Sequence, residues 1–254
     1  MKKIFLFILA LFVTSAYTQT GAFNSGEKFK FRIHYGFVNA GYATLELKEA
    51  TYNNKTVFHA KGYGYTTGMT KMFFKVKDDY QSYFDKQTGK PFKYIRKINE
   101  GGYTKDQEGY FNQVDHTVFV KDNESKSQKR IVVTDKVQDI VSSFYYLRNH
   151  PAINNIQKGE HISIDMFFDD EISKFKLKYL GKENIKTKFG TITSLKFRPF
   201  VQSGRVFKEE ESLTVWVSAD ENKIPLRIEA DLAVGSLKAD LESYSGLQHS
   251  IKFY

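Results

Sequence analysis

Apolar and polar side chains alternate along most of this chain, as they do in strands with one buried face. Between Glu27 and Phe37, aromatic or aliphatic residues fill every second position, and Lys28, Lys30 and Arg32 stand between them. The same alternation predicts about thirteen strands in all. They cover residues 27–37, 42–47, 57–65, 80–84, 92–98, 114–120, 127–133, 161–167, 175–179, 191–197, 212–217, 224–232 and 236–244. Each strand should therefore have an apolar face and a charged face.

Short turn signals separate these segments, among them Asn39-Ala40-Gly41, Gly101-Gly102 and Val234-Gly235. Short links make neighbouring strands pair antiparallel, because a parallel pair needs a crossover of a dozen or more residues. So many twisted strands do not stay flat in one sheet. We therefore predict a mainly β fold, a large antiparallel meander curled into a half-barrel or open barrel. Gly36, Gly41 and Gly235 are expected at a bulge and two turns.

One segment has helical spacing instead. Ile140, Val141, Phe144 and Leu147 recur at intervals of three and four, and Pro151 follows as a stop signal. The pattern predicts one central helix over about residues 138–149 that covers or plugs the sheet. A second break at 67–74 predicts a helical turn.

The first residues resemble a secretory signal peptide. Lys2 and Lys3 precede an apolar run from Ile4 to Val13, and small residues follow up to Ala16. Such a run rises only about 15 Å as a helix, half of the roughly 30 Å of a bilayer core. We predict a leader over 1–16, with cleavage as late as residue 20 as the alternative, and a single β domain over 21–254.

Composition narrows the class of protein. The chain has 254 residues, 40 of them Phe, Tyr or Trp, no Cys and a formal charge of +9. An apolar, aromatic-rich chain buries a core and does not stay disordered. Without Cys, the chain has no disulfide scaffold, no thiolate zinc site and no acylated lipoprotein cysteine. We therefore expect a periplasmic or secreted protein with no integral membrane span, and a monomer.

Three ordered segments resemble a known family. They are the stretch from Gly26 to Gly41, the helix from Asp139 to Arg148, and the pair Val215–Asp220 and Pro225–Glu229. Together they are similar to the exported bacterial proteins grouped as domain of unknown function 3108. The resemblance implies a large antiparallel half-barrel in the Gram-negative envelope. It implies no activity.

The chain lacks the spacings that mark catalytic, cofactor or metal sites. No two of the six His residues stand at the intervals of a zinc site, and Ser142-Ser143 lacks the glycines of a nucleophile elbow. The acidic runs 169–171 and 209–211 are expected at hairpin tips, where solvated charges are the usual role. We predict no enzyme, no cofactor and no bound metal, and no nucleic-acid partner.

The remaining candidates are ligand-contacting or structural residues on the helix and the last strands. Arg148 is expected to pair with neighbours of Asp139 or with Glu229, since a buried charge without a partner is costly. Trp216 should face away from Val215 and Val217. The full set is Asp139, Ser142, Tyr145, Tyr146, Arg148, Trp216, Arg227 and Glu229.

Two functions fit this picture. In the first, the aromatic-lined concavity binds a hydrophobic or anionic envelope ligand: a lipid, a glycolipid or a polysaccharide precursor. In the second, the basic sheet face, with Lys174, Lys176 and Lys178, docks on an envelope protein. The first requires an open concavity, whereas the helix and loops could also fill it.

Overall fold

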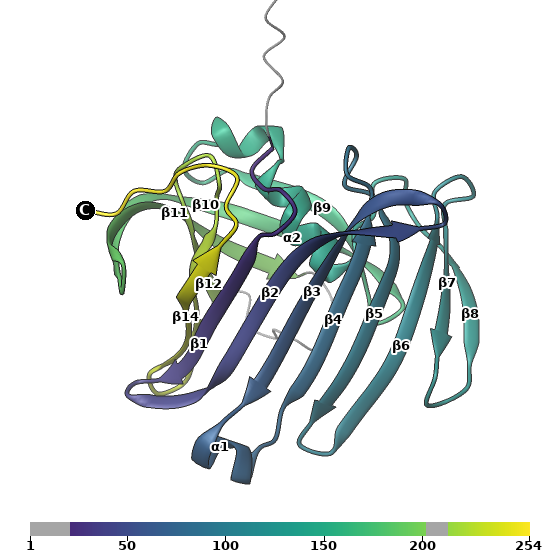
Figure 1. Ribbon diagram of the computed structural model, residues 1–254, viewed down its shortest axis with the longest axis horizontal. Coiled ribbons are helices and arrows are strands. Elements are labelled where there is room, and N and C mark those ends of the chain that lie inside the picture. The colour runs from purple at the N-terminus through teal and green to yellow at the C-terminus, as the bar shows by residue number, and fades with distance from the viewer. Residues whose placement is uncertain (1–20, 202–212) are drawn as a thin grey trace, which may run out of the picture.

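The computed structural model describes residues 21–201 and 213–254, and it is dominated by one antiparallel sheet of 14 strands (Figure 1). The strands lie in the order β8-β7-β6-β5-β4-β3-β2-β1-β14-β13-β12-β11-β10-β9. Their bounds are β1 Lys28–Tyr35, β2 Val38–Tyr52, β3 Lys55–Thr66, β4 Lys77–Phe84, β5 Pro91–Glu100, β6 Tyr103–Asn112, β7 Thr117–Asp122, β8 Gln128–Val132, β9 His161–Phe168, β10 Glu171–Thr187, β11 Gly190–Val201, β12 Leu213–Ser218, β13 Pro225–Asp231 and β14 Ser236–Ser245. The predicted mainly β meander is confirmed. The predicted leader and the acidic run 209–211 lie outside the described residues.

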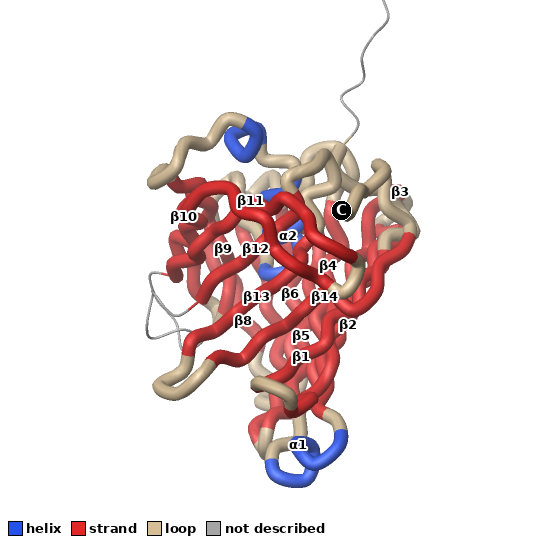
Figure 2. The backbone as a smooth tube through the Cα atoms, turned by 90° about the vertical axis from the view of Figure 1, so that its left-hand side faces the viewer, coloured by secondary structure: helices blue, strands red, loops and turns tan. Residues whose placement is uncertain are grey.

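The sheet curls until its two edge strands, β8 and β9, approach each other (Figure 2). The segment after β8 fills the gap between them. The Gln138 amide donates to the Asp165 carbonyl (2.8 Å), and the Phe167 amide donates to the Gln138 carbonyl (2.7 Å). The free edge of β9 is thus covered, which removes a site where another strand could pair.

The central helix α2, Ile140–Arg148, lies inside the curled sheet and packs against β3, β4 and β9 (Figures 1 and 2). Asp139 and Ser142 form a capping box at its start. Such a box satisfies backbone N–H groups that the first turn leaves unpaired. The prediction of one helix over about 138–149 is confirmed. The shorter α1 covers Gly68–Phe73, and a 3-10 turn covers Pro151–Asn154.

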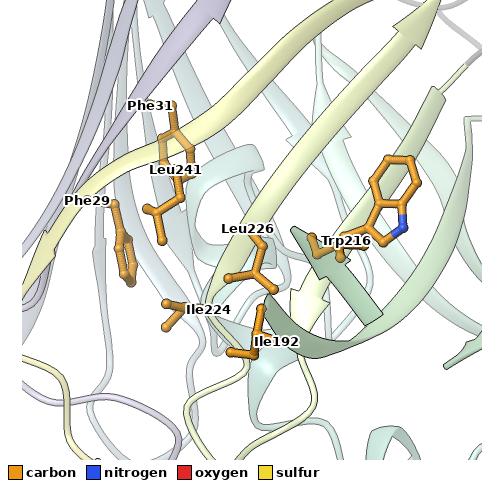
Figure 3. Close-up of a cluster of buried hydrophobic side chains, with 8 residues drawn as sticks. Phe29, Phe31, Ile192, Trp216, Ile224, Leu226 and Leu241 are labelled. Carbon is orange, nitrogen blue, oxygen red and sulfur yellow. The ribbon is translucent and has the colours of Figure 1, made fainter. Parts of the chain in front are cut away.

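The buried side chains form four clusters around the helix. One of them joins β1, β14 and the last strands, and Figure 3 shows most of its members. Its buried residues are Phe29, Phe31, Ile185, Ile192, Trp216, Ile224, Leu226 and Leu241. A second cluster joins Leu47 and Phe84 of the sheet to Val141 and Tyr145 of α2. The inner face of the sheet and the helix therefore share one core.

The barrel has two different ends. At the helix end lie α2, the first described residues and the C-terminus (Figure 1). At the other end, here called the α1 end, lie α1 and the turns β1–β2, β5–β6 and β13–β14 (Figures 1 and 2).

Some predicted boundaries were wrong. The turn after β1 is formed by Gly36 and Phe37, whereas Gly41 lies within β2, where a Cβ would stand 2.2 Å from the Tyr65 carbonyl oxygen. The strand predicted from Val114 begins only at Thr117, because residues 113–116 form a turn with His116 at φ 50°. The strand β6 was missed entirely.

Candidate functional site

Arg148 forms a buried ion pair with Glu27 at the helix end. Its Nη1 and Nη2 donate to the Glu27 carboxylate at 2.6 and 2.7 Å, and the two side chains are 3% and 0% exposed. Nε and Nη2 also donate to the Asn222 carbonyl oxygen (3.0 and 2.8 Å), and Nη2 donates to that of Ala22 (3.1 Å). The prediction that Arg148 pairs with Glu229 or with neighbours of Asp139 was wrong.

These bonds leave the Arg148 guanidinium no open face for a ligand. The rings of Phe23, Phe29, Phe144 and Tyr145 lie 5.2–5.7 Å from its central carbon. The group joins the start of the chain, the end of α2 and the β12–β13 turn. Arg148 is therefore a structural residue.

Asp139 and Ser142 also act in the fold. The Asp139 carboxylate accepts from the amides of Val141 and Ser142 (2.8 Å each) and from the Ser82 hydroxyl (2.6 Å). Burial raises the pKa of Asp139 to about 6 even though these bonds oppose the rise. The ionised form of a carboxyl group is less stable when buried than in water, so burial raises its pKa.

The two predicted tyrosines of α2 do not contribute to one common site. Tyr145 is buried between Phe23 and Phe84, and burial raises its pKa. The ring of Tyr146 lies edge-on to that of His150, at 5.7 Å. Neither side chain borders the cavity beside α2 that is described below.

Trp216, Arg227 and Glu229 each have partners of their own. Trp216 is buried while Val215 and Val217 are half-buried, as predicted, and its Nε1 donates to Glu183. Arg227 pairs with Asp240, and Glu229 with Lys238 at 3.1 Å. All three therefore have structural partners.

The concavity at the start of α2 is filled. The cavity there holds about 20 Å³, between Tyr94, Gln107, Asp139, Val141 and Phe167. That volume fits about one water molecule and no acyl chain. This part of the barrel therefore leaves no room for the ligand that the sequence analysis placed in the concavity.

Beyond α2 toward the α1 end, the inner face carries small or half-buried apolar residues. Leu47 packs with α2, so Ala43, which lies at even spacing on the same strand, also points inward. Ala43 pairs with Gly64, and no described atom lies within 4 Å of a Cβ built on Gly64. Ile33, Ala239 and Ile228 are paired in register and half-buried. We call this region, Ile33, Ala43, Gly64, Ile228 and Ala239, the lower interior.

A charged wall on β4, β5 and β6 faces the same space. Asp78 pairs with Gly64 in the register, and Arg96, Glu100 and Lys105 share its inward face. Arg96 pairs with Asp169, and Lys105 lies 3.3 Å from the same carboxylate. No sequence motif marks these residues, because only the pairing of the strands brings them together.

Two carboxyl groups of this wall are coupled. The hydrogen bond with the Asp78 carboxyl, followed by partial burial, raises the pKa of Glu100 to about 7. Two facing carboxylates repel each other, so Glu100 holds its proton to a higher pH than an isolated glutamate would. The wall can therefore change its charge near neutral pH.

The predicted basic face is only partly balanced by acids, since Lys176 and Lys178 form no ion pair with a described residue. Lys174 pairs with Asp165, Lys28 stands opposite Glu46, and Arg32 opposite Asp240. Within the described residues, no three His, Asp or Glu side chains are grouped so as to hold a metal ion. No helix in the described part of the chain is long and apolar enough to cross a membrane.

The fold and its filled helix end define a class, a curled β-meander with one internal helix. The chain belongs to the family described as protein of unknown function DUF3108, whose sequence model matches residues 30–242. The suspected family is therefore confirmed. No curated protein matches the chain.

Several solved structures are similar to this chain at low sequence identity. A β-barrel-like protein of the family DUF1849 from Brucella abortus has 9% identity and a TM-score of 0.55, over 88% of this chain and 98% of that one. A Parabacteroides distasonis protein provisionally classed as a lipoprotein has 13% identity and a TM-score of 0.39, over 89% and 99%. A DUF1089 family protein from Pseudomonas aeruginosa has 8% identity and a TM-score of 0.35, over 72% and 87%. The first likeness supports the fold and nothing more.

Proposed function

We propose that this chain is a non-enzymatic, monomeric binding protein of the bacterial cell envelope that holds one amphiphilic molecule, a lipid or glycolipid, in the lower interior. The observation that carries the proposal is the division of this space into an apolar wall and a charged wall. Ile33, Ile228 and Ala239 line one side, and Asp78 and Arg96 line the other.

The apolar wall suits an acyl chain. Its side chains are half-buried, and burying apolar surface is worth about 25 cal/mol for each Å². The small residues Ala43 and Gly64 leave room on the neighbouring strands β2 and β3. Ligand sites in proteins combine such apolar linings with a few polar groups that fix orientation.

The charged wall suits a polar headgroup. Lys105, and the Nε of Arg96, which has no hydrogen-bond partner although Nη1 pairs with Asp169, can donate to phosphate or to sugar oxygens. Glu100 can accept or donate according to its protonation. An aqueous small molecule would use only this wall, whereas an amphiphile uses both. The proposal therefore favours an amphiphile over a fully polar substrate.

The test is to recover the ligand and then to block its site. The processed chain, purified after expression of the full-length sequence, is examined by native mass spectrometry and by extraction of bound lipid. Gly64→Leu places a side chain in the open part of the lower interior, so the recovered ligand should fall at least about tenfold, because the leucine occupies the volume of the acyl chain. Circular dichroism and thermal unfolding would show that the fold is kept.

Tyr63→Leu is the matched control, because Tyr63 is the neighbour of Gly64 on the same strand and points outward. The control should retain the ligand. A wild-type protein that carries no extractable amphiphile would contradict the proposal, as would equal recovery from Gly64→Leu.

A further inference from the structure

Exposed apolar side chains gather at the α1 end of the barrel. Of the 15 large hydrophobic side chains that are exposed among the described residues, eleven lie on α1 or on the turns beside it. They are Tyr35, Phe37, Val38, Met69, Met72, Phe73, Phe74, Tyr103, Leu232, Val234 and Leu237. Single exposed hydrophobic residues are normal, but a concentration of them at one site marks an interaction surface.

These residues form one continuous rim, because contacts join each turn to the next. The Tyr35 hydroxyl donates to the Val234 carbonyl (2.9 Å), which joins the β1–β2 and β13–β14 turns. The Thr67 amide donates to the Ala40 carbonyl (3.0 Å), which joins β2 to α1. A Cβ on Gly101 would stand 2.3 Å from the Phe74 ring, so Phe74 packs over the β5–β6 turn. We call these joined turns the apolar rim.

The outermost side chains of the rim contribute little to the core. Phe37 is 102% exposed, Met72 and Phe73 are 83% exposed each, and α1 has no buried residue. These large apolar side chains on a short connecting helix bury little surface within the chain, so they contribute little to the stability of the fold. An external partner is the physical reason for them.

Positive charge accompanies the rim. Lys71, Lys75 and Lys77 are exposed on α1 and at the start of β4, and none of them forms an ion pair with a described residue. Other lysines on the outer face of the barrel lie beside an acid, as Lys61 does beside Asp79 at 2.9 Å. Three cations without an acidic partner therefore stand directly beside the exposed apolar side chains.

Tyrosines lie just above the rim on the outer face. Tyr42, Tyr63 and Tyr65 are half-buried, with ring centroids 6.0 Å apart between Tyr42 and Tyr65 and 5.7 Å apart between Tyr63 and Tyr65. Tyrosine is enriched where a protein meets the boundary between membrane and water, because its ring is apolar and its hydroxyl is polar. The tyrosines thus border the apolar rim and its lysines, since Tyr65 stands opposite Lys77 in the register.

We infer that the apolar rim docks on an anionic lipid bilayer surface, with Phe37, Met72 and Phe73 entering the boundary between headgroups and acyl chains. Lysines close to such a surface attract its anionic headgroups, and apolar side chains that enter it strengthen binding by burial. A protein partner would need a shape complementary to four protruding turns, whereas a bilayer accepts protruding side chains of any arrangement. The inference does not depend on the ligand proposed for the lower interior.

The docked orientation turns the α1 end of the lower interior toward the membrane. The apolar rim covers the turns from β13–β14 to β5–β6 at this end, and α2 lies toward the other end (Figure 1). An amphiphile could then pass between bilayer and interior without crossing water.

The test measures co-sedimentation of the processed chain with vesicles. One set contains phosphatidylcholine alone and the other contains about 30% phosphatidylglycerol. The wild type should bind the anionic vesicles, and added salt should weaken this binding because it screens the lysines. The triple variant Phe37→Ser, Met72→Ser, Phe73→Ser should bind at least about tenfold more weakly.

Two matched controls separate docking from unfolding and from net charge. The first is Val114→Ser, Val132→Ser, Tyr254→Ser, whose parent side chains are 86%, 76% and 79% exposed away from the rim. The second control compares two triple variants that remove the same charge. One is Lys71→Gln, Lys75→Gln, Lys77→Gln at the α1 end, and the other is Lys55→Gln, Lys158→Gln, Lys186→Gln at the helix end. Only the rim variants should lose vesicle binding.

Three results would overturn the inference. They are a wild type that binds neither kind of vesicle, a rim triple variant that binds as the wild type does, and control variants that lose as much as the rim variants. Ligand recovery from the same preparations is an independent readout, so a failure of docking can be told from a failure of the proposed ligand binding.

Discussion

Burial makes the fold depend strongly on the ion pair between Arg148 and Glu27. Both are buried, and each supplies the charge that the other needs. A buried charge that has lost its partner is far more costly than a missing surface ion pair. The pair also joins residues 121 positions apart in the sequence.

We predict that Arg148→Met lowers the free energy of unfolding by about 3–5 kcal/mol, because it leaves the Glu27 carboxylate buried and unpaired. Urea unfolding followed by tryptophan fluorescence measures the change. Arg227→Met is the control, since the Arg227 pair with Asp240 is partly exposed, and it should cost about 0–1 kcal/mol. Equal losses in the two variants would contradict the structural role of Arg148.

The raised pKa of Asp139 makes stability depend on pH. The pKa is about 6 in the folded chain, against a reference value of 3.8. The folded state therefore holds the proton more tightly than the unfolded state does. This group favours folding most below pH 3.8, and its contribution is lost as the pH rises to about 6.

We predict that Asp139→Asn removes this dependence. Asparagine is uncharged and can still accept from the Val141 and Ser142 amides. Relative to wild type, the variant should gain about 1.4 kcal/mol for each unit of difference between folded and unfolded pKa, as the pH rises from about 4 to 6. Urea unfolding at several pH values measures the gain. Ser142→Ala, which disturbs the same cap but keeps the carboxylate, should retain the wild-type slope; parallel curves for wild type and Asp139→Asn would refute the assignment.

At the scale of the strands, two inward-facing glycines have opposite surroundings. A Cβ on Gly109 of β6 would stand 1.9 Å from the Tyr94 ring, whereas no described atom lies within 4 Å of a Cβ on Gly64 of β3. Tyr94 is buried and donates to Gln107 at 3.0 Å, so its ring cannot move freely.

We predict that Gly109→Ala destabilises the chain by about 1–3 kcal/mol, because the methyl group overpacks the space of the Tyr94 ring. Gly64→Ala should be neutral or stabilise by about 0.5–1 kcal/mol, since alanine restricts the unfolded chain. Thermal and urea unfolding of the two variants measure the contrast. Similar effects at both positions would show that the interior is equally filled at both levels.

The same strand, β6, shows why the sequence did not predict the whole sheet. Its inward positions include Lys105, Gln107 and Gly109, so the apolar alternation that revealed the other strands is missing. Polar residues face inward there because they belong to the charged wall beside Asp169 and Asp170. Along β1, where the inward residues are apolar, the alternation was sufficient to predict the strand.

The candidate residues were harder to predict than the elements that carry them. Helical spacing located α2. The partner of Arg148 was not predictable, because Glu27 comes next to it only through the curl of the whole sheet. The same holds for Arg96 and Asp169, which lie 73 residues apart.

At the scale of the whole molecule, no continuous β-ladder joins the edge strands β8 and β9. Side chains and the single segment that follows β8 close the barrel there. Asp169 and Asp170, in the β9–β10 turn, reach Arg96, Lys105 and Lys129 on the other side of the gap. The strand β8 is short and exposed, whereas β1 is paired along its length on both sides. The gap between β8 and β9 should therefore open before the rest of the barrel unfolds.

We predict that Asp169→Asn together with Asp170→Asn speeds amide hydrogen exchange in β8, β9 and residues 133–138 by at least about tenfold and leaves β1 and β14 unchanged. The substitutions remove the carboxylates that hold the two edges together, while asparagine tolerates the positive φ of both positions. Exchange followed by mass spectrometry of peptides measures the rates. Glu171→Gln, in the same turn and without an ion pair to a described residue, is the control and should change nothing. Faster exchange in β1 and β14 as well would mean that the barrel opens as one cooperative unit, and the closure between β8 and β9 would then have no local role.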